Sequence, residues 1–148
     1  MMFHLKLTRV AQFWLALVSF AALSSPATGN EDDYPNWNAY VDVSVIELIT
    51  DDADGDVRKT KVWFVLLGGE PYLRTSNSRW LKNLRRDPNL KLVIEGKEYK
   101  AQAEEISGDA LREKVDIASQ RKYGFQESLI RLFSFRQSQI LRLMPRST

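Results

Sequence analysis

The sequence KVWFVLLGGEPYLRT, residues 61–75, is the clearest structural signal in the chain. Val62–Leu67 is an unbroken run of β-branched, aromatic and aliphatic residues, which predicts a central strand with apolar residues on both faces. Gly68 and Gly69 follow, and glycines tolerate the positive φ angles of a tight hairpin turn. Pro71–Thr75 then predicts a short returning strand. Residues 61–75 are therefore expected to form a β-hairpin.

Further short apolar runs on both sides of this hairpin predict more strands. The first is Val41–Ile49, where valine occupies positions 41, 43 and 45 and the alternation indicates one buried face. Thr50–Lys59, with charged residues around Gly55, predicts a loop. Three later segments are predicted strands: Leu90–Ile94, Tyr99–Ile106 and Gln139–Met144.

Helix signals separate the predicted strands. Ser76–Ser78 offers N-caps for a short helix over Arg79–Arg86, and proline at position 88 ends it. Ser107–Asp109 offers a cap for a second helix that runs to about Tyr123, with apolar residues at helical spacing. Gln126–Phe133 is a candidate third helix. Because strands joined by short turns pair antiparallel, the order predicts an α+β fold, a small six-stranded, mainly antiparallel split β-barrel with two or three helices.

Residues 1–27 have the features of a signal peptide. Lys6 and Arg9 form a short positive region, and the apolar run Val10–Leu23 follows it. Ser25 and Ala27 suit the small-residue positions of a signal peptidase site, so cleavage is expected near Ala27. An uncleaved anchor is the alternative, but the run is shorter than the roughly 20 apolar residues that a spanning helix needs. The sequence therefore predicts a periplasmic or secreted protein with no stable membrane anchor after cleavage.

Cleavage changes the composition on which functional arguments depend. Residues 28–38 are then a polar linker whose Trp37 packs on the domain, and residues 39–148 form the split-barrel domain. The signal holds two of the 21 basic residues and none of the 19 acidic ones, which leaves 19 of each. A net charge of zero argues against nucleic acid as a partner. The single histidine, His4, lies in the signal and the chain has no cysteine, which excludes triad chemistry, ordinary zinc sites and His- or Cys-ligated heme from the mature domain.

The segment RTSNSRWLKN, residues 74–83, is the richest in groups that bind anions. It brings a strand end, several hydroxyls and a helix N-terminus together, and the free N–H groups and dipole of a helix N-terminus favour a phosphate. Guanidinium groups suit phosphate oxygens as well. The alternative is structural, with Ser and Asn as helix caps and Arg and Lys as solvated residues. The candidate anion ligands are Arg74, Thr75, Ser76, Ser78, Arg79 and Lys82.

Three other features are candidate sites. Trp63, Trp80 and Tyr99 are candidate walls for a flat ring, although aromatic residues in a small barrel also serve as core. The acidic loop Asp51–Asp56 lacks the Gly and Glu spacing of an EF-hand, so a solvated loop without a metal is expected, with weak calcium binding as the alternative. The basic face of residues 79–86 gives a weak case for nucleic acid in a net-neutral domain.

Two stretches carry a family resemblance, residues 60–83 with the Gly-Gly turn and Trp80, and residues 116–146 with Lys122-Tyr123-Gly124 and the closing LRLMPR. They resemble domain-of-unknown-function family 2255 (DUF2255), which is similar to the flavin-binding split barrels that include pyridoxamine-phosphate oxidases and deazaflavin-dependent nitroreductases. The resemblance implies FMN or a related flavin whose phosphate is held by Arg74, Thr75, Ser76, Arg79 and Lys82. It also implies a homodimer with the flavin ring at the interface. Relatives often present a basic contact before the central strand, where this chain has Arg58, Lys59 and Lys61.

Two functional hypotheses follow. The first is an exported split barrel that binds a small phosphate-bearing ligand, a flavin nucleotide, with oxidoreductase activity supplied by the flavin. The second is a non-catalytic periplasmic domain that binds another ligand or a protein partner. The basic cluster of residues 74–82 favours the first hypothesis, while the signal peptide and the lack of an acid–base group assignable from the sequence favour the second.

Overall fold

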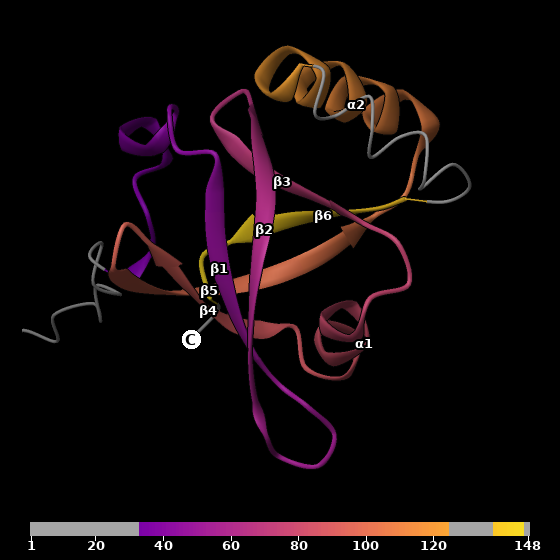
Figure 1. Ribbon diagram of the computed structural model, residues 1–148. Helices are drawn as coiled ribbons and strands as arrows, with labels where there is room; N and C mark the ends of the chain where they lie inside the picture. The colour runs from indigo at the N-terminus through magenta and orange to yellow at the C-terminus, as the bar shows by residue number, and fades with distance from the viewer. Residues whose placement is uncertain (1–32, 125–137, 147–148) are drawn as a thin grey trace, which may run out of the picture.

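The computed structural model describes residues 33–124 and 138–146, and they form a barrel with two α-helices (Figure 1). All six strand pairings are antiparallel, and the strands follow one another around the barrel in the order β1-β2-β3-β6-β5-β4, with β4 returning to β1. This confirms the predicted six-stranded α+β fold. The elements are β1 (Val45–Asp51), β2 (Val57–Leu67), β3 (Glu70–Thr75), α1 (Arg79–Arg86), β4 (Asn89–Ile94), β5 (Lys97–Ile106), α2 (Asp109–Tyr123) and β6 (Gln139–Met144).

The hairpin of β2 and β3 forms as predicted. Gly68 and Gly69 make the turn with φ angles of 60° and 84°, in the left-handed region that glycine adopts without strain. Successive residues of a strand point to opposite faces, so Phe64 enters the barrel while Val65 points outward. β2 therefore contributes to two separate apolar clusters.

The larger cluster fills the barrel and is closed by α1 and by a short 3₁₀ helix, Trp37–Tyr40. An eight-residue helix is marginal by itself, so α1 depends on burying Trp80, Leu81 and Leu84. Each large apolar side chain contributes roughly 1.5–3 kcal/mol when buried. Trp37 is also buried, as predicted for the end of the polar segment before the domain.

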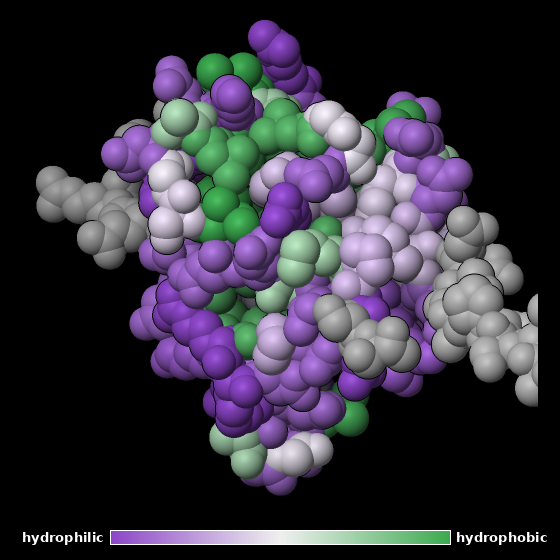
Figure 2. Space-filling view, turned by 180° about the vertical axis from the view of Figure 1, so that it is seen from behind, coloured by the Kyte–Doolittle hydropathy of each residue, from purple (hydrophilic) through white to green (hydrophobic). Residues whose placement is uncertain are grey.

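The smaller cluster lies outside the barrel, under α2. Val115 of α2 packs there against Val65 of β2, Tyr72 of β3 and Ile140 of β6. Helix α2 thus covers part of the outer surface of the barrel near the top of Figure 1. Seen from behind, the molecule has apolar side chains gathered in its upper part, with hydrophilic side chains around them (Figure 2).

The predicted start of the first strand was wrong. β1 begins at Val45 instead of Val41, and its buried residues are Ile46, Leu48 and Thr50. Val41 and Val45 are exposed, because the 3₁₀ helix ends immediately before Val41 and the chain turns before it enters the sheet. A shift of one residue exchanges the two faces of a strand, so the valine alternation predicted the wrong face.

Other boundaries also differ from the sequence prediction. Half of the predicted loop 50–59 is strand, because its two ends pair with each other and leave the turn of residues 52–56. The N-cap of α2 is Gly108, without a side-chain cap, instead of a serine or aspartate. Helix α1 is confirmed to the residue, and its N-cap is Ser78, which lies within the predicted cap segment Ser76–Ser78. The predicted signal 1–27, most of the linker 28–38 and the candidate helix Gln126–Phe133 lie outside the described residues.

Asp52 ties the β1–β2 turn to α1. Its carboxylate accepts hydrogen bonds from Nε and the terminal guanidinium nitrogen of Arg58, at 2.9 and 2.7 Å, and from the amide of buried Asn83 at 2.7 Å. The same Asn83 amide donates to the Thr50 hydroxyl at 3.1 Å. Hydrogen bonds from Arg58 and Asn83 hold the pKa of Asp52 well below its ordinary value.

No helix within residues 33–124 and 138–146 is long and apolar enough to cross a membrane.

The Asp52 network predicts acid-sensitive stability. A carboxyl whose pKa is lower in the folded chain stabilises the fold above its unfolded pKa, about 3.8 for aspartate, and this contribution is lost as the pH falls further. We expect the free energy of unfolding of Asp52→Asn to be lower at pH 7 and to fall less steeply below pH 4 than that of the wild type. Urea unfolding at several pH values measures both effects. An unchanged acid slope in the variant would contradict this assignment.

Candidate functional site

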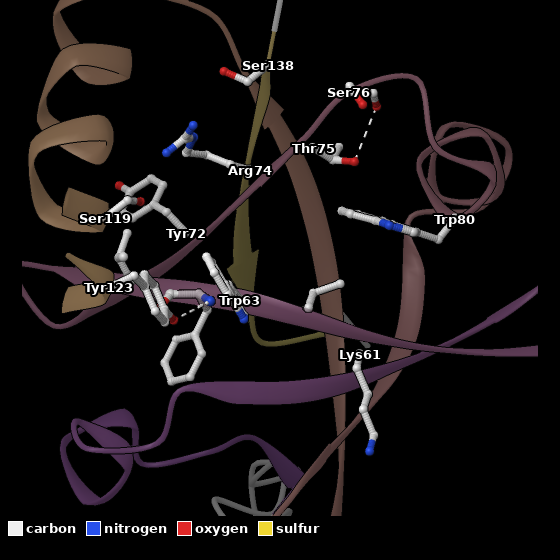
Figure 3. Close-up of a pocket in the computed structure, with 13 residues that line it drawn as sticks. Lys61, Trp63, Tyr72, Arg74, Thr75, Ser76, Trp80, Ser119, Tyr123 and Ser138 are labelled. Atoms are coloured by element: carbon white, nitrogen blue, oxygen red, sulfur yellow. Dashed lines mark hydrogen bonds between the residues drawn. The ribbon is translucent and has the colours of Figure 1, made fainter. Parts of the chain in front are cut away.

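A cavity of about 330 Å³ lies on the outer side of β2 and β3, between α2 and the start of α1 (Figure 3). Strands contribute most of its wall, and each helix contributes one or two side chains. The lining residues are Lys61, Val62, Trp63, Phe64, Val65, Tyr72, Arg74, Thr75, Ser76, Trp80, Ser119, Tyr123 and Ser138.

A pair of stacked aromatic rings forms one side of this cavity. The rings of Trp63 and Tyr123 are nearly parallel, with centroids 4.5 Å apart and an angle of 10° between their planes. Trp80 lies across the cavity from Tyr123, beyond Trp63, in Figure 3. The site therefore offers flat, apolar surfaces of the kind that stack against planar rings.

The Tyr123 ring is held by its hydroxyl, which is hydrogen-bonded to main-chain groups of Phe64 in β2 and of Ser44, directly before β1. The hydroxyl oxygen lies 2.6 Å from the Phe64 carbonyl oxygen and 2.8 Å from the Ser44 carbonyl oxygen, either of which accepts its proton. It also accepts a bond from the Phe64 N–H at 3.1 Å. These bonds fix the last turn of α2 against β2 and so set the position of the stack.

Arg74 supplies the positive charge inside the cavity. Its side chain is only 18% exposed, and its Nε lies 3.2 Å from the Oδ1 of Asp116 on α2. In Figure 3 the guanidinium points across the cavity toward α2, between Ser119 and Ser138. A cation in a mostly buried place interacts with a bound anion more strongly than a solvated one does, because water screens it less.

Hydroxyl groups continue from Arg74 toward α1. Thr75 donates its hydroxyl proton to the Ser78 Oγ at 2.9 Å or to the Ser76 carbonyl at 3.2 Å. The Ser78 Oγ in turn accepts the Leu81 N–H at 3.3 Å, which is the N-cap bond of α1. The hydroxyl of Ser78 is thus used to start the helix.

The structure separates the residues that the sequence grouped into one anion site. Trp63, Arg74, Thr75, Ser76 and Trp80 line the cavity, and the other predicted ligands, Ser78, Arg79 and Lys82, do not.

The reason is the buried face of α1. Burial of Trp80, Leu81 and Leu84 turns Arg79 and Lys82 toward solvent. Arg79 has a 67% exposed side chain and lies 3.5 Å from the carboxylate of Asp52.

The basic residues before the hairpin also take different places. Arg58 is bound to Asp52, and Lys59 lies 4.0 Å from Glu47. Lys61 lines the cavity, although its side chain points away from the stacked rings in Figure 3.

Tyr123, Tyr72, Ser119 and Ser138 line the cavity but were not predicted from the sequence as site residues. For Tyr123 a usable signal existed, because it is an aromatic residue in the last turn of a helix, directly before a C-cap glycine. Ser119 lies on the same face of α2 as the buried Val115, but a single serine carries no signal of its own.

In the described part of the chain, no group of three or more His, Cys, Asp or Glu side chains is arranged to hold a metal ion. The described residues that line the cavity also include no carboxylate. Its chemistry is therefore that of aromatic faces, hydroxyls and cations.

Comparison with known proteins gives one family and a set of similar folds. The family model described as "Uncharacterized protein conserved in bacteria (DUF2255)" matches residues 38–140. No match was found among curated proteins.

Similar solved structures include the heme storage protein HutZ from Vibrio cholerae, at 20% identity and a TM-score of 0.59, covering 78% of this chain and 92% of that one. An F420-H2-dependent reductase matches at 16% identity and a TM-score of 0.56, covering 69% of this chain and 95% of that one. A putative pyridoxamine 5'-phosphate oxidase from Listeria innocua matches at 13% identity and a TM-score of 0.53, covering 70% of this chain and 85% of that one. At these identities the comparison establishes a shared split-barrel fold.

The bonds of the Tyr123 hydroxyl predict a measurable loss of stability when it is removed. Tyr123→Phe keeps a ring that can stack on Trp63 but leaves main-chain groups of Phe64 and Ser44 without this partner. A buried polar group without a partner costs about 1–3 kcal/mol, so we expect a decrease of that size in the free energy of unfolding. Urea denaturation followed by circular dichroism measures it. Equal stability of variant and wild type would show that the hydroxyl does not fasten α2.

Proposed function

The chain belongs to the DUF2255 family of bacterial proteins, and we propose that it is an exported split-barrel domain that binds a phosphate-bearing ligand, a flavin nucleotide such as FMN. The observation that carries this proposal is the combination of stacked aromatic rings and a mostly buried arginine in one cavity. A flavin nucleotide has the matching combination, a planar ring system and a phosphate.

Each part of the ligand has assigned partners in the proposal. The ring system packs on Trp63 and Trp80, because stacking of a flat ring on their apolar faces is favourable. The phosphate is held by Arg74, Thr75 and Ser76, because a guanidinium and hydroxyls suit phosphate oxygens. Ser78, Arg79 and Lys82 are left out, since they lie outside the cavity.

The names of the similar structures support a ligand with a planar ring system. One stores heme, one is a reductase that depends on F420-H2, and one is a putative oxidase of pyridoxamine 5'-phosphate. Heme fits the present cavity less well than a flavin does. Its iron needs an axial ligand, and the hydroxyls of Tyr72 and Tyr123 are already bound to Glu70 and to the main chain.

A bound flavin would supply hydride and electron transfer, which is the basis for proposing oxidoreductase activity. Among the residues that the structure describes, the lining includes no carboxylate and no histidine. The chain's own part is therefore to bind and orient the ligand and to hold charge beside its phosphate.

We also propose that the working form is a homodimer. The resemblance to flavin-binding split barrels supports this, because such barrels are usually dimers with the ring at the interface. The cavity described here lies on the outer side of the barrel, where a second subunit can cover it.

The second candidate is a non-catalytic exported domain that binds another ligand or a protein. The predicted signal peptide favours it, because a chain exported unfolded meets its cofactor outside the cytoplasm. Binding of FMN separates the two candidates.

Titration with FMN tests the proposal. We expect saturable quenching of FMN fluorescence and a rise in melting temperature with the mature domain. In Arg74→Ala the affinity should fall about tenfold or more, since a charge-assisted hydrogen bond contributes about 1.5–3 kcal/mol. The melting temperature of Arg74→Ala should no longer respond to FMN.

Two matched variants control this experiment. Asp116→Asn removes the negative partner of Arg74 while keeping the arginine, so we expect FMN affinity to be equal or higher. Arg79→Ala removes an exposed arginine five residues away, outside the cavity, and should leave affinity unchanged. No binding in the wild type, or equal loss in Arg79→Ala and Arg74→Ala, contradicts the proposed site.

Export is tested by the mass of the protein recovered from cells. When the full chain is produced in a Gram-negative host, we expect a soluble periplasmic form that begins at or near Thr28. Leu17→Arg places a charge inside the apolar run and should block processing. Recovery of the full-length wild-type chain in the cytoplasm would contradict export.

A further inference from the structure

The positive charge of Arg74 is compensated within the chain. Its Nε lies 3.2 Å from the Oδ1 of Asp116, and the two side chains are only 18% and 31% exposed. The two atoms that face each other are themselves buried. Because water screens such a pair weakly, an anion that binds Arg74 is also repelled by the carboxylate of Asp116.

The position of Asp116 follows from the packing of α2. Val115, directly before it, is completely buried in the cluster under the helix. Ser119, one turn further along, is buried and lines the cavity. In Figure 3 the guanidinium of Arg74 points toward this part of α2. A ligand that enters the cavity therefore meets the guanidinium and the carboxylate together.

A second arginine adds to the charges at this end of the cavity. Arg112 lies one turn before Asp116 on α2, and its guanidinium donates a hydrogen bond to the Ser138 carbonyl oxygen at 2.6 Å. Lys61 also lines the cavity, but its side chain points away from the others in Figure 3. Among the described residues, the two arginines and the aspartate beside the expected phosphate position therefore leave one net positive charge.

The common forms of organic phosphate differ in how well they match one positive charge. A phosphomonoester such as that of FMN carries close to two negative charges at pH 7, because its second pKa is about 6. A phosphodiester has no second proton to lose and keeps a single negative charge. The hydroxyls that line the cavity suit the oxygens of either form. Only the second charge of a monoester is left without a cation and close to a carboxylate.

We propose that Asp116 sets the charge of the ligand that the cavity accepts, so that a flavin phosphodiester binds in preference to a flavin phosphomonoester. This proposal rests on the proposed function and specifies the class of flavin nucleotide. Asp116 is a positioning residue, because it holds the guanidinium of Arg74 and opposes a second ligand charge without contacting the ligand. The preferred ligand is a flavin whose phosphate is esterified at two of its oxygens.

Three flavins with the same ring system and different charges test the proposal. They are riboflavin, which has no phosphate, riboflavin cyclic phosphate, which has one negative charge, and FMN, which has nearly two. In titrations of the processed protein at about pH 8, the cyclic phosphate should bind about tenfold or more tightly than FMN, and riboflavin should bind more weakly than the cyclic phosphate. At about pH 5.5 the phosphate of FMN holds a second proton, so the two phosphates should bind equally within about threefold.

The change of pH acts on the ligand. The only histidine of the chain is His4 and cysteine is absent, so no described side chain is of a type that ordinarily changes charge between about pH 5.5 and 8. Glu70 and Lys122 contact the lining residues Tyr72 and Tyr123 from outside the cavity. Both are the same in the wild type and in the variants below, so their charges cancel in the comparison.

Two variants of α2 locate the effect. Asp116→Asn keeps the size of the side chain and removes its charge, so affinity at about pH 8 should rise most for FMN, less for the cyclic phosphate and not for riboflavin. The preference for the cyclic phosphate should then be lost. Asp109→Asn makes the same change at an exposed position two turns earlier and should leave all three affinities unchanged. Melting temperatures check that both variants fold, and the comparison of flavins in the wild type needs neither.

The possible results are distinct. A preference for the cyclic phosphate that is lost both at low pH and in Asp116→Asn supports the proposal. Equal or tighter binding of FMN at about pH 8 overturns it and leaves the proposed flavin site intact. The same holds for a preference that persists at low pH, which would reflect shape, and for an equal change of all three flavins in Asp116→Asn, which would reflect structure. If none of the three flavins binds, the proposed function fails and this proposal fails with it.

Discussion

Strand β2 is covered on both of its faces, and two cavities are built on it. Its alternation places Phe64 in the barrel, while Val65 on the opposite face packs under α2. The part of β2 near Trp63 forms a wall of the first cavity, and the part at Leu66 and Leu67 forms a wall of a second cavity beside α2. Since α2 lies against the strand between these parts, the position of one helix determines the shape of both cavities.

The local elements were largely predictable from the sequence. The hairpin of residues 61–75 and helix α1 have strong signals, a glycine pair and a serine N-cap, and both form where expected. The start of β1 was not predictable from alternation, because the preceding 3₁₀ helix buries Trp37 and changes which residues enter the sheet. Similarly, residues 57–59 are polar but become strand because they pair with β1.

The site was predictable only in part, because the sequence does not show which way each side chain points. Arg74 and Arg79 are five residues apart and chemically identical, yet one lines the cavity and the other is mostly exposed beside Asp52. The difference follows from the buried face of α1, which is a tertiary property. Tyr123 joins Trp63 from 60 residues further along the chain, and no local pattern shows such a contact.

The closed order of the strands has a consequence for how this chain can associate. Each of the six described strands is bonded to a neighbour on both sides, which leaves only short stretches along which another polypeptide can add a strand. One such stretch is residues 57–63 of β2, which pair with β1, while β3 pairs only with residues 64–67. Over the rest of the barrel, a partner meets side chains and cavities instead of unpaired main-chain groups. Amyloid-like stacking is disfavoured for the same reason, since it requires strands with unpaired main-chain groups.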